Sequence, residues 1–178
     1  MNRFTYRCAL VFAAFVFASC SAGAKGKPVA GDGSELALGT VCSIRVFDGY
    51  SAQALDAAFA RIREIDATMS ANAPGTALAS INDAAGIRPV SAPKDLLFVL
   101  EKALSYASLS GGAFDPSIGP LVKLWNIGME GERIPSVAEI QDALPLVDAA
   151  SVLVDDSAGT VFLAKKGMRL DLGAIAKG

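Results

Sequence analysis

Two long amphipathic segments constrain the fold of this 178-residue chain more than any other feature. In residues 51–70 and 91–110, apolar side chains recur every three or four positions, which is the period of an α-helix with one buried face. Ser51 is placed to cap the first helix, while Ser91 and Pro93 are placed to begin the second. Both helices need a partner surface, which the remaining segments must supply.

That surface is predicted to be a β-sheet built from both ends of the chain. Residues 36–48 alternate polar and apolar side chains, as a half-buried strand does. Residues 152–154 and 161–163 are predicted to pair across a turn, and residues 168–172 form another extended run. A shorter helix over residues 134–145 has serine and glutamate in capping-box spacing. This order predicts an α+β fold with a mostly antiparallel sheet and packed helices.

Residues 1–19 are predicted to be a signal peptide. Two arginines precede an apolar run that is too short to form a stable membrane anchor. Small residues then stand before Cys20, as at the lipoprotein cleavage site of bacteria, although Phe17 occupies the usual place of leucine. This resemblance implies an exported protein that is anchored to the membrane through lipid on Cys20 and faces the periplasm. A plain secretory signal is the alternative.

Charge, cysteine and histidine usage limit the chemistry further. Without residues 1–19, two of the 16 basic residues are lost, which leaves 14 basic against 18 acidic residues and no basic patch for nucleic acid. Lipid on Cys20 would leave Cys42 unpaired, whereas a Cys20–Cys42 disulfide is the alternative. The absence of histidine excludes a histidine-based triad or zinc site within this chain. Residues 20–34 are small and polar and predict a flexible tether, so that residues 35–178 form the domain.

The stretch SGGAFDPSIGPLVKLW, residues 110–125, combines residues that shape the backbone with one carboxylate. Its double glycine lets the backbone approach a flat ring or a phosphate, where N–H groups of Ala113 and Phe114 can meet the ligand. Phe114 adds an apolar contact. Asp115 can accept hydrogen bonds from a ligand or from the turn's own N–H groups. From the residues alone, an Asp-Pro turn that closes a helix, with Trp125 in the core, is the alternative.

The stretch LDLGAIAKG, residues 170–178, places a carboxylate at the end of a strand. Asp171 precedes the expected start of a helix, where unpaired N–H groups favour anions. Lys177 adds a positive charge that can reach a phosphate or pair with the carboxylate. A surface salt bridge between the two side chains is the alternative.

Together with LGT at residues 38–40, these two stretches resemble the ApbE-like family of FAD:protein FMN transferases, over about residues 38–178. The resemblance implies Mg²⁺-dependent transfer of FMN from FAD to a threonine of a target redox protein. It also implies that the backbone oxygen of Ala174 helps to hold Mg²⁺. The residues that it places at FAD are Leu38, Asn72, Ala113, Phe114, Asp115, Asp171 and Lys177.

Three positions depart from the family pattern. Asn72 stands where a tyrosine is frequent, and its loss of stacking, worth about 0.5–1.5 kcal/mol, predicts FAD binding weaker by at most about tenfold. Loosely held FAD would be open to attack by water, so an Mg²⁺-dependent FAD pyrophosphatase that yields FMN and AMP is the second hypothesis. Leu38 replaces methionine at similar volume, and Ala174 replaces glycine at a position that uses only its main chain.

The chain ends where a helix is expected to begin, and its predicted sheet is thin for so many helices. We therefore expect the N-terminal half of a larger domain, with the remaining metal ligands and any general base beyond Gly178. The 178-residue form alone is expected to be inactive. A non-catalytic flavin-binding lipoprotein is the third hypothesis.

Overall fold

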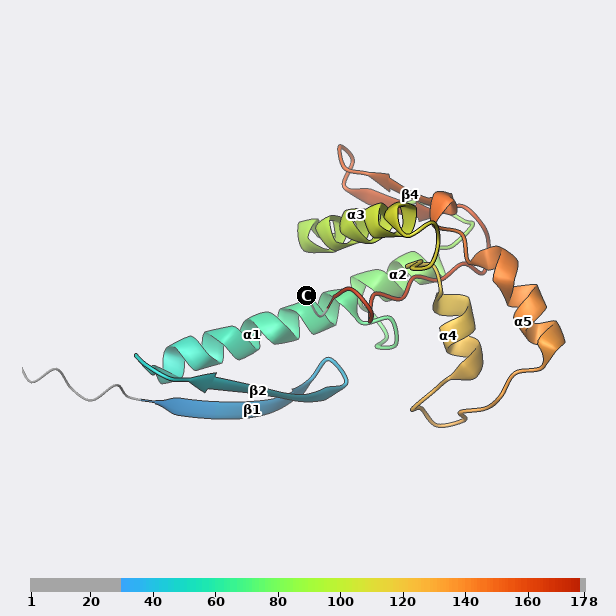
Figure 1. The fold of residues 1–178 in the computed structure, drawn as a ribbon. Helices are drawn as coiled ribbons and strands as arrows, with labels where there is room; N and C mark the ends of the chain where they lie inside the picture. The colour runs from blue at the N-terminus through green and yellow to red at the C-terminus, as the bar shows by residue number, and fades with distance from the viewer. Residues whose placement is uncertain (1–29, 177–178) are drawn as a thin grey trace, which may run out of the picture.

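The computed structural model describes residues 30–176. The predicted signal peptide, Cys20 and Lys177 lie outside the described residues. Within them the chain folds as an α+β structure with two small antiparallel sheets, which confirms the predicted fold class (Figure 1). The helices are α1 (Ala52–Met69), α2 (Ala77–Asp83), α3 (Lys94–Leu109), α4 (Gly119–Trp125), α5 (Val137–Ala143) and the 3₁₀ helices η1 (Leu144–Leu146) and η2 (Ala149–Ser151). The strands are β1 (Gly31–Ala37), β2 (Thr40–Val46), β3 (Val90–Ser91), β4 (Val152–Asp155) and β5 (Thr160–Leu163).

The first sheet is a hairpin, whereas one strand was predicted over residues 36–48. Strands β1 and β2 pair antiparallel and are joined by Leu38 and Gly39, whose φ angles of 54° and 70° are those of a tight hairpin turn. Residues 31–34, which the sequence placed in the tether, form the first half of β1. Glycine, aspartate and serine have low strand propensity, so only the tertiary structure identifies this strand.

Helix α1 packs lengthwise along the hairpin (Figure 1). It begins as predicted after Ser51, whose side chain accepts a hydrogen bond from the N–H of Ala54. Its buried side chains are Leu55 and Phe59. A Cβ atom on Gly33 of β1 would lie 2.9 Å from a methyl group of Leu55, so glycine is needed for this close approach.

The second sheet has the strand order β3-β5-β4 and contributes to the main core. The predicted pairing of residues 152–154 with residues 161–163 is confirmed. Residues 168–172 do not join this sheet, yet their alternate side chains enter the same core. The core's most deeply buried large side chains are Leu78, Ile81, Leu96, Leu100, Val161, Leu163, Met168, Leu170 and Leu172.

Helix ends follow the local sequence in part. At α5 the predicted capping box is present, with Ser136 and Glu139 each bonding the other's backbone N–H. At α3 the N-cap residue is Pro93, and Ser91, predicted as a possible cap, lies in β3 instead. Helix α4 was not predicted, because Gly119 and Pro120 at its start resemble a turn.

Over residues 30–176, no helix has both the length and the hydropathy required to cross a membrane.

Candidate functional site

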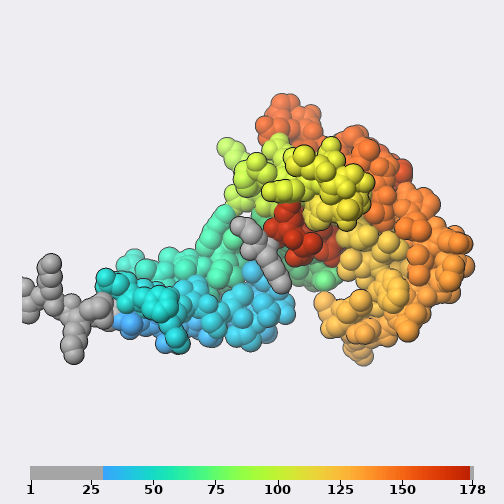
Figure 2. Space-filling view, in the orientation of Figure 1, coloured from blue at the N-terminus to red at the C-terminus, as the bar shows by residue number. Residues whose placement is uncertain are grey.

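The two motif stretches lie against each other through their backbones. The N–H of Asp171 donates to the carbonyl oxygen of Pro116 at 2.9 Å, and the N–H of Gly119 donates to that of Arg169 at 3.1 Å. Ile118 and Arg169 form a parallel β-bridge. Figure 1 shows the C-terminal segment passing next to α2, and Figure 2 shows it reaching the surface beside the end of α3. The two turns therefore fold against each other.

The C-terminal run has one buried and one outward face. Met168, Leu170 and Leu172 are at most 1 % exposed, whereas Arg169 and Asp171 between them are partly exposed. Because side chains alternate along an extended backbone, both charged side chains leave the core on the same side. This pattern presents a guanidinium and a carboxylate together at the surface.

The carboxylate of Asp115 is held by groups of the protein itself. Its Oδ1 accepts from the backbone N–H and the hydroxyl of Ser117 at 2.7 and 2.6 Å, and its Oδ2 accepts from the N–H of Ala149 at 3.1 Å. Of the two roles predicted for Asp115, the structure therefore bears out bonding to the turn's own N–H groups. The side chain joins the motif to the segment before β4.

A polar network extends from this carboxylate to Lys165. The buried Ser117 hydroxyl accepts from the N–H of Asp148 at 2.7 Å, and the carboxylate of Asp148 accepts from Ser151 at 2.6 Å and from Lys165 at 2.7 Å. The hydrogen bond from Lys165, followed by that from Ser151, lowers the pKa of Asp148 to about 2. The network is therefore charged at neutral pH and ties η2 to the Asp-Pro turn.

The backbone around Ala113 does not offer free donors, in contrast to the prediction. The N–H of Ala113 bonds the carbonyl oxygen of Ser110 at 3.3 Å, and the N–H of Phe114 bonds its hydroxyl at 3.0 Å. The Phe114 side chain instead lines an uncharged, mostly apolar hollow of about 470 Å³. The hollow is lined by Tyr106, Leu109, Ser110, Phe114, Ala174 and Ile175. Its size and character suit part of a flat ring system.

Asp171 lies in the turn that borders this hollow. Its Oδ1 accepts from the N–H of Gly173 at 2.8 Å. Within residues 30–176, no donor bonds to its Oδ2, which leaves one carboxylate oxygen for a ligand. Ala174 in the same turn is exposed. Of the residues predicted at FAD, Asp171 is thus the carboxylate with the greatest remaining bonding capacity.

The same turn can contribute to a metal site without forming one alone. In the described part of the chain, no group of three or more acidic or cysteine side chains is arranged to hold a metal ion. The carbonyl oxygen of Ala174 accepts no hydrogen bond from residues 30–176. Mg²⁺ keeps several water and phosphate oxygens as ligands, so this carbonyl fits the role of one protein ligand among them.

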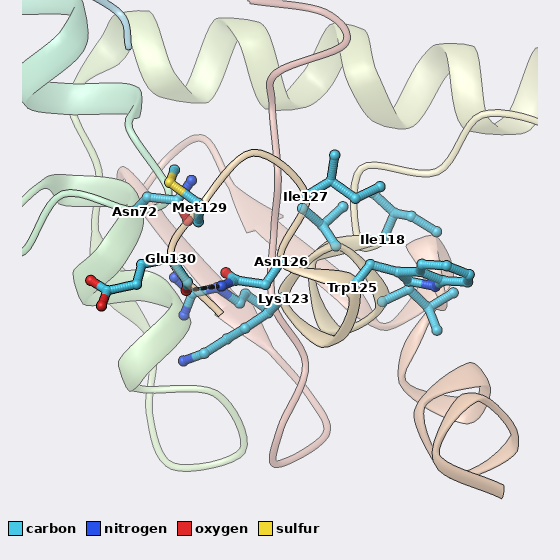
Figure 3. A pocket seen from close by; sticks show the side chains of 11 residues that line it. Asn72, Ile118, Lys123, Trp125, Asn126, Ile127, Met129 and Glu130 are labelled. Atoms are coloured by element: carbon cyan, nitrogen blue, oxygen red, sulfur yellow. Dashed lines mark hydrogen bonds between the residues drawn. The ribbon is translucent and has the colours of Figure 1, made fainter. Parts of the chain in front are cut away.

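Asn72 lies apart from the Phe114 hollow, on the wall of an open groove of about 820 Å³ (Figure 3). The groove is largely apolar and has both Lys123 and Arg169 on its wall. Arg169 also donates to the backbone carbonyl of Ala71. The remaining lining residues are Ile118, Leu121, Val122, Trp125, Asn126, Ile127, Met129 and Glu130. Arg169 connects this groove with Asp171, two residues further along the chain.

Leu38 lies in the turn of the β1–β2 hairpin and does not belong to either of the two motif stretches. Its N–H donates to the carboxylate of Asp66 in α1 at 3.0 Å, and 47 % of the residue is exposed. Its positive φ is unusual for a branched apolar side chain and indicates local strain. The structure therefore ties Leu38 to α1 and leaves its side chain available for contact.

Sequence reasoning missed Arg169, Lys123 and Asn82. The alternation of Met168 to Leu172 places Arg169 on the same face as Asp171, and this signal was present in the sequence. Lys123 depends on helix α4, which was not predicted. Asn82 gives no sequence signal for its contact, because its partner lies in the C-terminal run.

Solved structures share this α+β fold. One is the ApbE protein of Thermotoga maritima, with a TM-score of 0.76 and 30 % identity, over 84 % of this chain and 49 % of that one. Another is the flavin transferase ApbE of Vibrio cholerae, with a TM-score of 0.75 and 22 % identity, over 85 % and 50 % of the two chains. The fold and the paired motifs are thus those of an ApbE-type domain.

The chain belongs to the ApbE family, whose profile matches residues 38–178. A FAD:protein FMN transferase of Treponema pallidum is 40 % identical over 154 residues, which cover 82 % of this chain and 42 % of that protein. Another of Klebsiella pneumoniae is 38 % identical over 120 residues, which cover 67 % and 38 %. The chain therefore spans less than half the length of these curated relatives.

Proposed function

We propose that this chain takes part in Mg²⁺-dependent transfer of FMN from FAD to a threonine of a target redox protein. One observation carries the proposal: Asp171, whose Oδ2 accepts no hydrogen bond from residues 30–176, lies in a turn that is bonded to Pro116 and borders the Phe114 hollow. Membership in the ApbE family and relatives named FAD:protein FMN transferase support it.

Each part of the site has a distinct task in this proposal. The Phe114 hollow takes a flat ring of FAD, and Asp171 accepts a hydrogen bond from a hydroxyl or N–H group of the dinucleotide. Arg169 and, as the family resemblance implies, Lys177 place positive charge near the pyrophosphate. Asp115 stabilises the conformation of the Asp-Pro turn in its own motif.

The reaction is a phosphoryl transfer. The threonine oxygen forms a bond to the phosphorus of the FMN half, the bond between that phosphorus and the bridging oxygen breaks, and AMP leaves with the electron pair. The threonine hydroxyl loses its proton to water or to the phosphate of the leaving AMP. Positioning and charge neutralisation account for most of the catalysis in such reactions. A bound Mg²⁺, with the Ala174 carbonyl oxygen as one ligand, supplies charge neutralisation at the pyrophosphate.

The full-length gene product, incubated with FAD, Mg²⁺ and a threonine-bearing acceptor protein, tests this proposal. We expect flavin fluorescence on the denatured acceptor, its loss when the acceptor threonine is replaced by alanine, and its loss on chelation of Mg²⁺. The variant Asp171→Asn is expected to slow transfer. An acceptor that stays non-fluorescent with the wild-type protein argues against transfer.

A second candidate function is favoured by Asn72, which is exposed on the groove wall and offers no aromatic surface. Weakly held FAD would admit water as the acceptor, so that the protein acts as an FAD pyrophosphatase. Release of AMP from FAD without acceptor protein supports this activity. The variant Asn72→Tyr is expected to bind FAD up to about tenfold more tightly through stacking. Unchanged affinity would exclude the stacking explanation.

The cellular setting is also part of the proposal. Export and lipid on Cys20 would place the site at the membrane, facing periplasmic or membrane-bound acceptor proteins. Labelling with radioactive palmitate is expected to mark the wild-type protein but not Cys20→Ser. FAD bound without any turnover would instead support a non-catalytic flavin-binding lipoprotein.

A further inference from the structure

Asn82 is a buried amide that bonds the C-terminal run through both of its polar atoms. Its Nδ2 donates to the carbonyl oxygen of Leu170 at 3.1 Å, and its Oδ1 accepts from the N–H of Leu170 at 2.7 Å. Asn82 is 7 % exposed, and the contact links α2 to a residue far along the chain. The side-chain amide thus bonds Leu170 as the backbone of a neighbouring strand would.

This contact fixes a segment that has few other backbone partners. Residues 168–172 do not belong to either sheet, and their backbone is bonded on one side by Pro116 and Gly119. Asn82 supplies the bonds to Leu170 that none of the strands in residues 30–176 provides. Without them, two backbone groups at the 0 % exposed Leu170 would be buried without partners, and the segment would shift to satisfy them.

Leu170 stands directly between Arg169 and Asp171. Any rotation of its peptide planes therefore changes the direction of both outward side chains. Small displacements of positioned groups reduce binding and catalysis strongly, even when the moved residue keeps its identity. The contact between Asn82 and Leu170 therefore affects the site through Arg169 and Asp171, the two neighbours of Leu170.

We propose that Asn82 is a positioning residue: by bonding both backbone groups of Leu170, it aims the Asp171 carboxylate and the guanidinium of Arg169 at bound FAD. Asn82 itself is buried and does not touch the ligand. The inference rests on the proposed function, because it requires FAD to bind at Asp171. It assigns to a buried asparagine of α2 a role in dinucleotide affinity.

A double-mutant cycle on FAD affinity tests this role in the full-length gene product. The dissociation constant of FAD is measured by flavin fluorescence for wild type, Asn82→Ala, Asp171→Asn and the double variant, at a temperature where circular dichroism shows all four folded. We expect each single change to weaken FAD binding by about tenfold. This factor corresponds to the loss of about one hydrogen bond to a charged group. The loss of FAD affinity in the double variant should be smaller than the sum of the two single losses, since part of the effect of Asn82 passes through Asp171.

Leu78→Ala is the matched control, because Leu78 is fully buried in the same helix and does not contact the Leu170 backbone through a hydrogen bond. It should lower the thermal midpoint without changing FAD affinity. The variant Asn82→Asp keeps the acceptor for the Leu170 N–H and should recover part of the affinity lost in Asn82→Ala.

The possible failures are distinct. Independent, additive losses in the cycle, or an Asn82→Ala variant with wild-type affinity, would overturn the positioning role while FAD binding itself stands. A wild-type protein that does not bind FAD would overturn the proposed function and this inference together.

Discussion

The backbone N–H of Asp171 donates to the carbonyl oxygen of Pro116 at 2.9 Å, which joins two turns that are distant in sequence. A second hydrogen bond, from the N–H of Gly119 to the carbonyl oxygen of Arg169, extends the contact between the two turns. Main-chain bonds of this kind require close approach and do not depend on side-chain identity, except where a side chain would prevent the approach. The contact therefore restricts the residue type at Gly119 most strongly.

Gly119→Ala is predicted to separate the two turns. A Cβ atom there would lie 2.5 Å from the carbonyl oxygen of Arg169, which is too close for any ordinary contact. Overpacking of this kind costs about 1–3 kcal/mol, and loss of the Gly119 hydrogen bond adds about 1 kcal/mol. The free energy of unfolding, measured with urea, should fall by this amount. Val122→Ala on the exposed side of α4 should change it by less than about 1 kcal/mol.

Ser117→Ala is predicted to weaken the turn around Asp115. The fully buried Ser117 hydroxyl donates to Asp115 and accepts from the N–H of Asp148, so alanine leaves a carboxylate and an amide each short of one bond. We expect a loss of about 2–3 kcal/mol in the free energy of unfolding. Ser157→Ala removes an exposed hydroxyl that also bonds a carboxylate, Asp155, and should cost less than about 0.5 kcal/mol. Equal effects of the two changes would contradict this account.

Helices α1 and α3 could be predicted from sequence because their burial follows a regular period, and the outward face of residues 168–172 was open to the same argument. The hairpin could not, because β1 is rich in glycine, aspartate and serine and its turn uses Leu38 instead of asparagine. Packing against α1 overrides both local preferences. Long helical patterns thus identify elements, whereas short strands depend on tertiary contacts.

The site was predictable in its motifs but not in its bonding. Sequence alone left open whether Asp115 serves a ligand or the turn, since its third donor, Ala149, lies in a segment without periodic pattern. The hydrogen bond from the Phe114 N–H to the hydroxyl of Ser110 likewise could not be predicted from the sequence. Hydrogen-bond partners of this kind leave no periodic signal in the sequence. The roles of these polar groups could therefore be assigned only from the structure.

Leu38→Asn is predicted to stabilise the hairpin. Leu38 and Gly39 both have positive φ, and asparagine followed by glycine is the preferred pair for such a turn. Relief of the left-handed leucine should raise the free energy of unfolding by about 1 kcal/mol. Leu38→Ala keeps the strained backbone and should give no such gain. If FAD affinity is unchanged in Leu38→Asn, the Leu38 side chain has no part in the site.

Lys165→Gln is predicted to alter the acid sensitivity of the protein through Asp148. Lys165 is the largest cause of the lowered pKa of Asp148, which is about 2 in the folded protein. A carboxyl whose folded pKa is depressed stabilises the fold above its ordinary pKa of about 4, and this contribution is lost as pH falls through the folded value. Without Lys165 the pKa of Asp148 should rise toward its ordinary range, but not reach it, because Ser151 still donates.

Carboxyl carbon NMR titration measures this pKa directly, and urea unfolding at pH 6 and pH 3 measures its effect on stability. The variant should lose less stability than wild type between these pH values. Lys166→Gln is the matched control, since Lys166 is exposed and forms no salt bridge within residues 30–176. Glu139, whose pKa is lowered to about 2 chiefly by Arg133, should titrate unchanged in both variants. An Asp148 pKa that stays near 2 without Lys165 would show that the serine and backbone donors alone hold the carboxylate.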